Sequence, residues 1–408
     1  MERFSYSLYT YGGGVYYDKK TPDVVYRGIN PHLEAWAKEL LSCGLIDELV
    51  KKRLFPKTKI SKQKIDGYNL VLEHEAILPI TYPHEWTDEM FRAVAILILK
   101  VNQIANKYKF DISDPAWANV VFCHHKPIYI DFGSFQPQTY LAIRPEISDF
   151  HSKDSFLQSF LPRLELAHRA NMTTLPRCLR EAKLFFIRVM LAIHRRMKRY
   201  LFGYEKIVNK IARLRYKTLH QRLEKKLLSY NCAVKSPWVD YHTPKKPFVD
   251  FYDKNNQINK KDRRIKFLLD SIKPLKPDSL LDLAGNQGAM ARFFAKQLNI
   301  PKVICLDYDR GAIDRFFLNA KHDNRVAMAS FDITRSLLPE SGDITERLKS
   351  DVVLALAVTH QLLITQRLAP EVMFKIFAAY SKKYLIVEFM PRGCWDGIHQ
   401  PPIPEWYN

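Results

Sequence analysis

Three aspartates stand where a parallel sheet would present ligand-binding side chains. Asp282 lies in the apolar run SLLDLA, Asp307 follows KVICL, and Asp332 follows VAMASF. A carboxylate at 307 can accept hydrogen bonds from both hydroxyls of a ribose, and one at 332 can accept from an adenine amino group. Each acid alone is equally well explained as a helix cap. Their order, each at the carboxyl end of an apolar run, indicates a site for an adenosine-containing ligand.

A tight turn of small residues, DLAGNQG, follows the first of these runs. Small residues allow the backbone to approach a ligand, and the helix that the turn opens favours a carboxylate or phosphate at its N-terminus. A dinucleotide-binding fold is the main alternative. The turn lacks the G-x-G-x-x-G pattern because Ala284 stands where the first glycine would be, which weakens that alternative.

The elements that must position these residues alternate regularly after residue 260. The expected helices span 260–272, 289–298, 311–320 and 369–382. The expected strands span 279–284, 302–306, 326–331, 351–357 and 384–389. Continuous apolar runs are typical of strands that are covered on both faces, so this part of the chain predicts a doubly wound α/β sheet. Asp351 begins its strand, at the opposite edge from the site, and is expected to be structural.

Five segments resemble successive motifs of class I S-adenosylmethionine-dependent methyltransferases. They are DLAGNQGAMARFFAK, VICLDYD, ASFDIT, DVVLALAVTHQLLI and YLIVEFMPRG. The resemblance is to a bacterial subgroup with a DLGCNTG-type first motif, an ALALxHHL-type fourth motif and a kinase-like N-terminal region. It implies S-adenosylmethionine as the cofactor and a Rossmann-like domain over 236–408. The sequence departs from the pattern at Ala284, which replaces a glycine, and at Gln361, which replaces the second His of a pair.

The resemblance also implies residue roles. The cofactor-binding residues are then Asp282, Ala284, Gly285, Asn286, Gly288, Asp307, Tyr308, Phe331 and Asp332. His360 is the candidate base that removes a proton from the methyl acceptor, with a packed or capping histidine as an equal alternative. Glu388 is a candidate for orienting the acceptor, and a structural hydrogen bond is its alternative. The fold usually ends with an antiparallel pair of strands, which we expect to be lacking after Pro391.

A second motif lies in FDISDPAWANVVFCHHKPIYIDFGSF. Asp114 and Asn119 have the D-x-x-x-x-N spacing of a kinase catalytic loop, and a D-F-G at Asp131 follows 12 residues later. In kinases the first Asp positions the hydroxyl acceptor, while the Asn and the second Asp hold magnesium on the phosphates. Arg27 stands roughly where the ATP-binding lysine belongs, with Glu34 as its expected partner. Arg27 and Ile112, which replaces the usual His or Tyr, indicate a degenerate kinase-like domain.

Composition adds further expectations. The net charge is +20, and Lys and Arg are concentrated over 188–226, so an anionic partner is an alternative to a solvated helical face. The six cysteines have no zinc-ligand or redox spacing, and neither a signal peptide nor a membrane span is evident, which predicts free thiols in the cytoplasm.

The predicted domains are an α+β kinase-like domain (1–150), a basic helical segment (151–235) and the methyltransferase domain (236–408). The expected function is methyl transfer from S-adenosylmethionine to an O or N of a small-molecule or glycan-type acceptor. Alternatives are a bifunctional kinase–methyltransferase that also binds MgATP, an inactive scaffold, and a nucleic-acid-associated protein.

Overall fold

The computed structural model describes most of the chain and contains two compact units. The described residues are 1–3, 13–138, 152–172, 219–232, 234–236, 238–239, 258–260, 262–320, 325–339, 343–394, 399 and 401–407. Unit 1 draws on Met1–Ile77, Met90–Val121 and Pro127–Ala233. Unit 2 draws on Leu78–Glu89, Phe122–Lys126 and Val234–Asn408.

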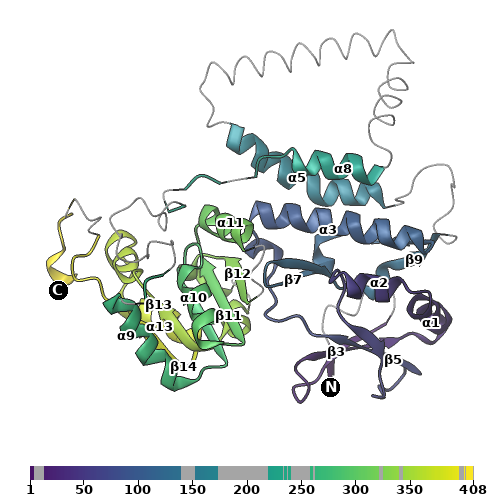
Figure 1. The fold of residues 1–408 in the computed structure, drawn as a ribbon, viewed down its shortest axis with the longest axis horizontal. Coiled ribbons are helices and arrows are strands. Elements are labelled where there is room, and N and C mark those ends of the chain that lie inside the picture. Colours follow the sequence, from purple (N-terminus) through teal and green to yellow (C-terminus); the bar gives the residue numbers. More distant parts are fainter. Residues whose placement is uncertain are drawn as a thin grey trace, which may run out of the picture. The chain divides into compact units, whose positions relative to one another are not determined.

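Unit 2 is built on a five-stranded parallel sheet (Figure 1). Its strands are β10 (Ser279–Leu283), β11 (Lys302–Asp307), β12 (Val326–Ser330), β13 (Ser350–Ala355) and β14 (Ser381–Val387). They lie in the order β12-β11-β10-β13-β14, and every pair is parallel. The order reverses direction at β10, so the switch point, where such sheets bind ligands, lies between β10 and β13.

Helices connect these strands, as parallel pairing requires. They are α9 (Arg263–Ile272), α10 (Ala289–Leu298), α11 (Arg310–Asn319), α12 (Ile344–Leu348) and α13 (Pro370–Ala379). The predicted α/β alternation is therefore confirmed, with ends shifted by a few residues. It could be predicted because the residues of β10, β12 and β13 are all buried, so that each strand is one apolar run.

The core of unit 2 lies between the sheet and the helices that cover it. Leu281, Ile304 and Val353 of three neighbouring strands are completely buried, as are Ile376 and Phe377 of α13. A fully buried side chain of this size contributes about 1.5–3 kcal/mol. This packing fixes the carboxyl ends of the strands, which carry the predicted site.

The described residues after β14 include a 3₁₀ helix, Glu405–Tyr407. Tyr407 is buried, its hydroxyl donates to the carbonyl oxygen of Met390 at 3.0 Å, and its ring stacks on Phe389 with 5.1 Å between ring centroids. This segment therefore packs back on the end of β14. That the last strand pair is lacking stays a prediction.

Unit 1 contains a five-stranded antiparallel sheet in the order β1-β2-β3-β5-β4. These strands are β1 (Glu2–Arg3), β2 (Val15–Tyr17), β3 (Val24–Ile29), β4 (Thr58–Ile60) and β5 (Leu70–Glu75). Two short pairs follow, β6 (Phe110–Ile112) with β9 (Phe135–Pro137) and β7 (Val120–Cys123) with β8 (Lys126–Tyr129). The unit is thus α+β; that it is kinase-like stays a prediction.

The helices of unit 1 are α1 (Glu34–Ser42), α2 (Leu45–Lys51), α3 (Asp88–Lys107), α5 (Lys153–Met172) and α8 (Leu219–Leu228). The apolar run 93–99 lies within α3. Phe91 of α3 packs on Phe160 of α5, with 5.1 Å between centroids. The Nε2 atom of His220 in α8 lies 2.6 Å from the Oδ1 atom of Asn102, so α3 contacts both of the described helices in the predicted basic segment.

Two short stretches from the predicted first domain belong to unit 2. In the first, the 3₁₀ helix Pro83–Glu85 contacts β12. In the second, the ring of Phe122 packs 5.2 Å from Trp86 and 6.0 Å from Phe317. The units are therefore not contiguous in sequence, whereas the three predicted domains are.

Several composition-based expectations concern residues outside the described part. Residues 188–218, which hold most of the basic segment, and Cys178 lie there. The five described cysteines are free thiols, as expected. No helix in the described ranges combines the length and apolarity needed to cross a bilayer.

Candidate functional site

Asp307 is the central carboxylate of the site at the carboxyl edge of the sheet. It ends β11 and is 5% exposed. Its Oδ2 atom accepts from the amide of Asn286 at 2.7 Å, and its Oδ1 atom accepts from the amide of Asp309 at 2.8 Å. Burial raises its pKa to about 6, although these backbone hydrogen bonds act in the opposite direction. Each oxygen keeps a further lone pair for a ligand hydroxyl.

Asp282 lies on the neighbouring strand, β10, just before the loop 284–288. Its Oδ2 atom accepts from the amide of Ala291 at 3.1 Å, which joins β10 to the first turn of α10. Burial raises its pKa to about 7. A Cβ at Gly285 would lie 2.7 Å from the same Oδ2 atom, so only glycine leaves this carboxylate undisturbed. Asp282 is therefore a support for the loop that borders the site.

Backbone strain is concentrated at this edge of the sheet. Ala284, Asn286 and Ala357 have φ angles of 56°, 53° and 50°, a left-handed conformation that is costly for residues with a Cβ. The Oδ1 atom of Asn286 is also buried without a hydrogen-bond partner. Strained backbone and unsatisfied buried polar atoms are typical of ligand sites, where the ligand completes the interactions.

Replacing Gly288 by Ala is expected to destabilise unit 2 by about 2–4 kcal/mol. The φ angle of Gly288 is 67°, and its Cβ would lie 2.3 Å from the ring of Phe316. Hydrogen exchange of peptides from α10 measures the loss. Gly67→Ala is the control, because Gly67 also has a positive φ (85°) but no atom within 4 Å of the added Cβ. Equal effects of the two variants would contradict the proposed clash.

A strap of described residues, 234–236 and 238–239, contacts the two loops of the site. The side chain of Asn286 donates to the carbonyl oxygen of Trp238 at 3.0 Å, and Gln287 donates to that of Val239 at 2.6 Å. Ser236 donates to Asp309, the N-cap of α11, at 2.7 Å. The sequence indicated only a domain boundary here, because nothing in a Pro-, Lys- and aromatic-rich stretch shows which backbone carbonyls it will present.

The predicted adenine-side residues lie at the expected strand ends. Phe331 follows β12, and its amide donates to the carbonyl oxygen of Asp307 at 2.9 Å. Asp332 is exposed, and its Oδ1 atom caps the next turn by accepting from the amide of Thr334 at 3.0 Å. Tyr308 is 53% exposed. The structure thus brings Asp307 and Phe331 together, while one oxygen of Asp332 is used as a cap.

His360 lies after β13, on the same edge of the sheet. It is the residue before a π-helical turn, Gln361–Thr365, and it is half-buried. Burial lowers its pKa, so that the ring is neutral near pH 7. Its Nδ1 atom is buried without a hydrogen-bond partner. A neutral imidazole with an unsatisfied nitrogen retains the chemistry expected of a base.

Glu388 makes the structural hydrogen bonds that are the alternative to its orienting an acceptor. Its Oε2 atom accepts from the guanidinium of Arg264 at 2.5 Å and from the amide of Ala357 at 2.9 Å. These contacts tie the end of β14 to α9 and to the loop after β13, so the structural alternative describes Glu388 better. Sequence reasoning missed Arg264, because nothing distinguishes it from the neighbouring Arg263.

Asp351 has the structural role that was expected. It accepts from the amide of Asp278 at 3.0 Å and lies 3.4 Å from Lys383, both at the amino edge of the sheet.

In unit 1 the structure brings four of the five predicted kinase-like residues together in two pairs. Arg27 is buried, and its Nη2 atom lies 3.3 Å from Oδ1 of Asp131. Asn119 donates to the Oδ2 atom of Asp114 at 2.9 Å. The carbonyl oxygen of Asn119 also accepts from the amide of Ile130, which places the two pairs side by side. The Nε and Nη1 atoms of Arg27 are buried without a hydrogen-bond partner.

The expected Arg27–Glu34 pair is wrong. Glu34 accepts from the side chain of Asn69 at 3.0 Å and lies 3.6 Å from Lys38 on the next turn of α1. Arg27 is instead neutralised by Asp131. Gly13, before β2, packs directly on the backbone of Gly28.

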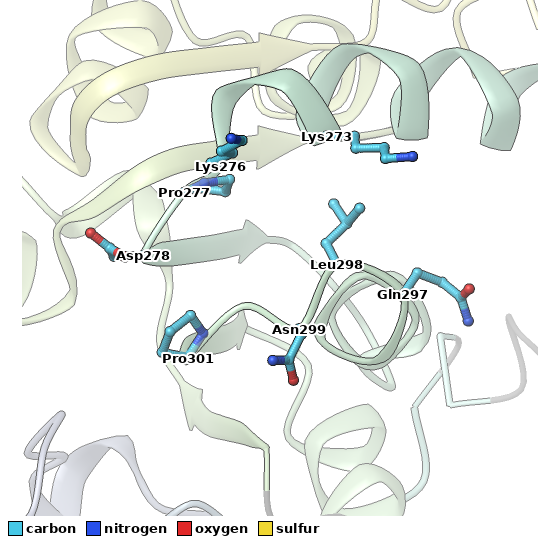
Figure 2. Close-up of a pocket in the computed structure, with 8 residues that line it drawn as sticks. All are labelled: Lys273, Lys276, Pro277, Asp278, Gln297, Leu298, Asn299 and Pro301. Carbon is cyan, nitrogen blue, oxygen red and sulfur yellow. The ribbon is translucent and has the colours of Figure 1, made fainter.

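A hollow of about 390 Å³ lies at the opposite edge of the unit 2 sheet (Figure 2). Its lining residues are Lys273, Lys276, Pro277, Asp278, Gln297, Leu298, Asn299 and Pro301. These precede β10 and β11, so the hollow contains none of the predicted site residues. No group of three or more His, Cys, Asp or Glu side chains within the described ranges is placed to hold a metal ion.

Comparisons with known proteins give distant likenesses. No family model matches the chain. It is similar to nodulation protein NoeA of Rhizobium meliloti strain 1021, with 24% identity over 358 residues that cover 79% of this chain and 71% of that protein.

The solved structures to which the chain is similar include the following three proteins. The methyltransferase domain of a bacterial CtHen1 is 16% identical (TM-score 0.26; 35% of this chain, 76% of that one). Monomeric WbdD is 13% identical (TM-score 0.29; 41% of this chain, 43% of that one). Coclaurine N-methyltransferase bound to N-methylheliamine and S-adenosylhomocysteine is 16% identical (TM-score 0.25; 55% of this chain, 60% of that one). TM-scores this low do not establish a shared fold, so the function rests on the geometry of the site.

Proposed function

We propose that unit 2 binds S-adenosylmethionine at the carboxyl edge of β10, β11 and β12 and transfers its methyl group to an O or N of a small-molecule or glycan-type acceptor. The observation that carries this proposal is Asp307. It is a buried carboxylate at the end of the second strand, held by two backbone amides and with lone pairs left for two ribose hydroxyls.

The residues present fit this cofactor. Asp307 would hold the ribose, and Phe331 and Asp332 the adenine. The loop 282–288 would border the methionine part, where the unsatisfied Oδ1 atom of Asn286 can accept from an ammonium group. The strained φ angles at Ala284 and Asn286 keep this loop close to the site.

When bound, the cofactor supplies an electrophilic methyl group on a sulfonium. The protein must then align the acceptor and, for a hydroxyl or cationic amine, remove its proton. His360 is the residue that we assign to proton removal, because burial keeps its ring neutral and its Nδ1 atom has no hydrogen-bond partner. We assign Glu388 no part in this step, because its Oε2 atom is held by Arg264 and the amide of Ala357.

The test of this function is a calorimetric titration of the intact protein with S-adenosylmethionine and with S-adenosylhomocysteine. A separate titration with NADH tests the dinucleotide-binding alternative. The proposal predicts micromolar binding of the first two ligands and none of NADH. Binding of NADH alone would contradict it.

The affinity for S-adenosylhomocysteine is expected to fall as the pH drops through about 6. Only an ionised Asp307 accepts from both ribose hydroxyls, and its pKa in the free protein is raised to about 6 by burial. Ligand binding therefore favours the ionised form, and affinity decreases by up to about tenfold per pH unit below that value. Titrations between pH 5 and 8 measure this slope. The pKa of Asp282 is raised to about 7, so this residue can also contribute to the pH dependence of the affinity. The part of the slope that disappears in Asp307→Asn is the part due to Asp307.

We also propose, as a second candidate function, that unit 1 binds a nucleotide as MgATP. The Arg27–Asp131 and Asp114–Asn119 pairs support it, together with the two unsatisfied nitrogens of Arg27. Asp131 and Asn119 would hold the magnesium. Titration with MgATP, beside Asp131→Asn and the exposed control Asp66→Asn, should show binding that only the first variant loses. No binding by the intact protein would contradict this second function.

A further inference from the structure

Three aromatic side chains, which we call the aromatic platform, pack together after the end of β14. The ring of Phe389 stacks on that of Tyr407, with 5.1 Å between centroids and 27° between planes, and Trp406 packs at 79° to Tyr407 at 6.1 Å. Tyr407 is buried, whereas Phe389 is 52% and Trp406 59% exposed. Single exposed aromatic residues are common on protein surfaces, but two that are held by a third, buried ring form a contiguous apolar patch, which marks an interaction site.

The aromatic platform is fixed to the carboxyl edge of the sheet beside His360. The hydroxyl of Tyr407 donates to the carbonyl oxygen of Met390 at 3.0 Å. Burial raises the pKa of this hydroxyl, and a hydrogen bond with the side chain of Thr359, the residue before His360, lowers it. Thr359 in turn donates to the carbonyl oxygen of Glu388 at 2.9 Å. The platform therefore borders the residue to which we assign proton removal.

The backbone that carries the aromatic platform is restricted. The segment 401–404 (PPIP) contains three prolines, each of which fixes its own φ angle. The segment before it packs on the π-helical turn that follows His360, because a Cβ at Gly393 would lie 2.8 Å from Ile364 and 3.7 Å from Ile403. The two exposed rings are thus held in place before a ligand arrives, which lowers the entropy cost of binding.

The chemistry of the aromatic platform suits a neutral partner with a flat apolar face. Its two segments, 389–394 and 401–407, carry one cation, Arg392, and one anion, Glu405, so they have no net charge. The face of an aromatic ring is partially negative and attracts weakly positive C–H groups. A pyranose ring with equatorial hydroxyls presents only C–H groups on its two faces, and its hydroxyls lie at the rim.

We propose that the aromatic platform binds the methyl acceptor by stacking on the face of a neutral pyranose ring. This inference rests on the proposed function, because it names the acceptor class of the same site. It goes beyond that function by assigning Phe389 and Trp406 to acceptor binding. Because the platform borders His360, a sugar stacked there has its rim hydroxyls on the side of the sheet where the base lies, as methyl transfer to oxygen requires.

The test is saturation-transfer difference NMR of the intact protein with cellotetraose, a β-linked glucose oligomer, and with sorbitol, which has similar hydroxyls but no ring. The proposal predicts transfer to the ring protons of cellotetraose, with a dissociation constant in the millimolar range, and none to sorbitol. Phe389→Leu and Trp406→Ala are each expected to weaken cellotetraose about three- to tenfold, the loss of one stacking contact. Trp406→Phe keeps a ring and should retain most of the affinity. The control is Phe267→Ala, because Phe267 is another exposed aromatic residue of unit 2, on α9.

A titration of each protein with S-adenosylhomocysteine separates this inference from the function it rests on. Folded variants that lose cellotetraose but bind S-adenosylhomocysteine within about twofold of the unaltered protein would support the acceptor site. If the intact protein binds cellotetraose but not S-adenosylhomocysteine, the proposed function fails, and the acceptor role of the platform fails with it. If it binds S-adenosylhomocysteine but not cellotetraose, only the inference is wrong.

Two further outcomes would also contradict the inference. One is that Phe389→Leu and Trp406→Ala bind cellotetraose as well as Phe267→Ala does. The other is an oligomer of the unaltered protein that Trp406→Ala dissociates in sedimentation velocity, because the platform would then be a contact between copies of the chain. Thermal melts of each variant identify any loss of fold, and Phe389→Leu keeps an apolar side chain against Tyr407 for that reason.

Discussion

Asp307→Ala is expected to weaken binding of S-adenosylhomocysteine by about 100-fold or more in a calorimetric titration. Each hydrogen bond from a ribose hydroxyl to this carboxylate is charge-assisted and contributes about 1.5–3 kcal/mol, and the variant loses both. Asp307→Asn keeps one acceptor oxygen. Its affinity for S-adenosylhomocysteine is expected to lie between those of Asp307→Ala and the unaltered protein. The same order of affinities should hold for S-adenosylmethionine.

The control for this prediction is Asp351→Asn. Asp351 is also a buried aspartate of the sheet, but it lies at the amino edge, where it holds the amide of Asp278 and Lys383. Its replacement should leave the affinity within about threefold. Because Asp307 also holds the amides of Asn286 and Asp309, a melting curve of Asp307→Ala must accompany the titration. Unchanged affinity in a folded Asp307→Ala variant would contradict the assigned ribose site.

Arg347→Met is expected to destabilise unit 2 by about 3–5 kcal/mol, the cost of breaking a buried ion pair. The guanidinium of Arg347 contacts the completely buried Glu85, donates to the carbonyl oxygen of Ile80, and lies 4.1 Å from the ring centre of Tyr82. Without Arg347, the Glu85 carboxylate is buried with no compensating charge. Hydrogen exchange of peptides from α12 and from 78–89 measures the loss of opening free energy.

A double variant shows whether the buried charge is the cause. Glu85→Gln with Arg347→Met removes both charges and should be less destabilised than the sum of the single variants. Lys349→Met is the matched control, because Lys349 pairs at 3.0 Å with the exposed Glu346 and should contribute less than about 1 kcal/mol. Additive effects of the two buried substitutions would contradict the ion-pair explanation.

The sheet of unit 2 could be predicted because its strands are buried on both faces. Each of β10, β11 and β12 is a single apolar run, and parallel strands place their carboxyl ends at one edge. The positions of Asp282, Asp307 and Phe331 near the carboxyl ends of these runs therefore predicted that the three residues lie at the same edge of the sheet. The same reasoning placed Asp351 at the other edge.

The contacts that could not be predicted join residues far apart in sequence. Arg264 reaches Glu388 across 124 residues, and Arg347 reaches Glu85 across 262. No local sequence pattern indicates either pair, because an arginine at a helix surface can reach many different carboxylates. The Arg27–Glu34 pairing was wrong for the same reason, because Arg27 pairs with Asp131, 104 residues away, while Glu34 accepts from the distant Asn69.

Hydrogen exchange of the intact protein with and without saturating S-adenosylhomocysteine tests the central claim most directly. The amides of Asn286 and Asp309 donate to Asp307, so ligand bound there should slow exchange in the peptides 279–298 and 302–319 and leave the peptides of β3 and β5 unchanged. Protection confined to unit 1, or calorimetrically detected binding with no protection in those two peptides, would contradict a cofactor site at the carboxyl edge of this sheet.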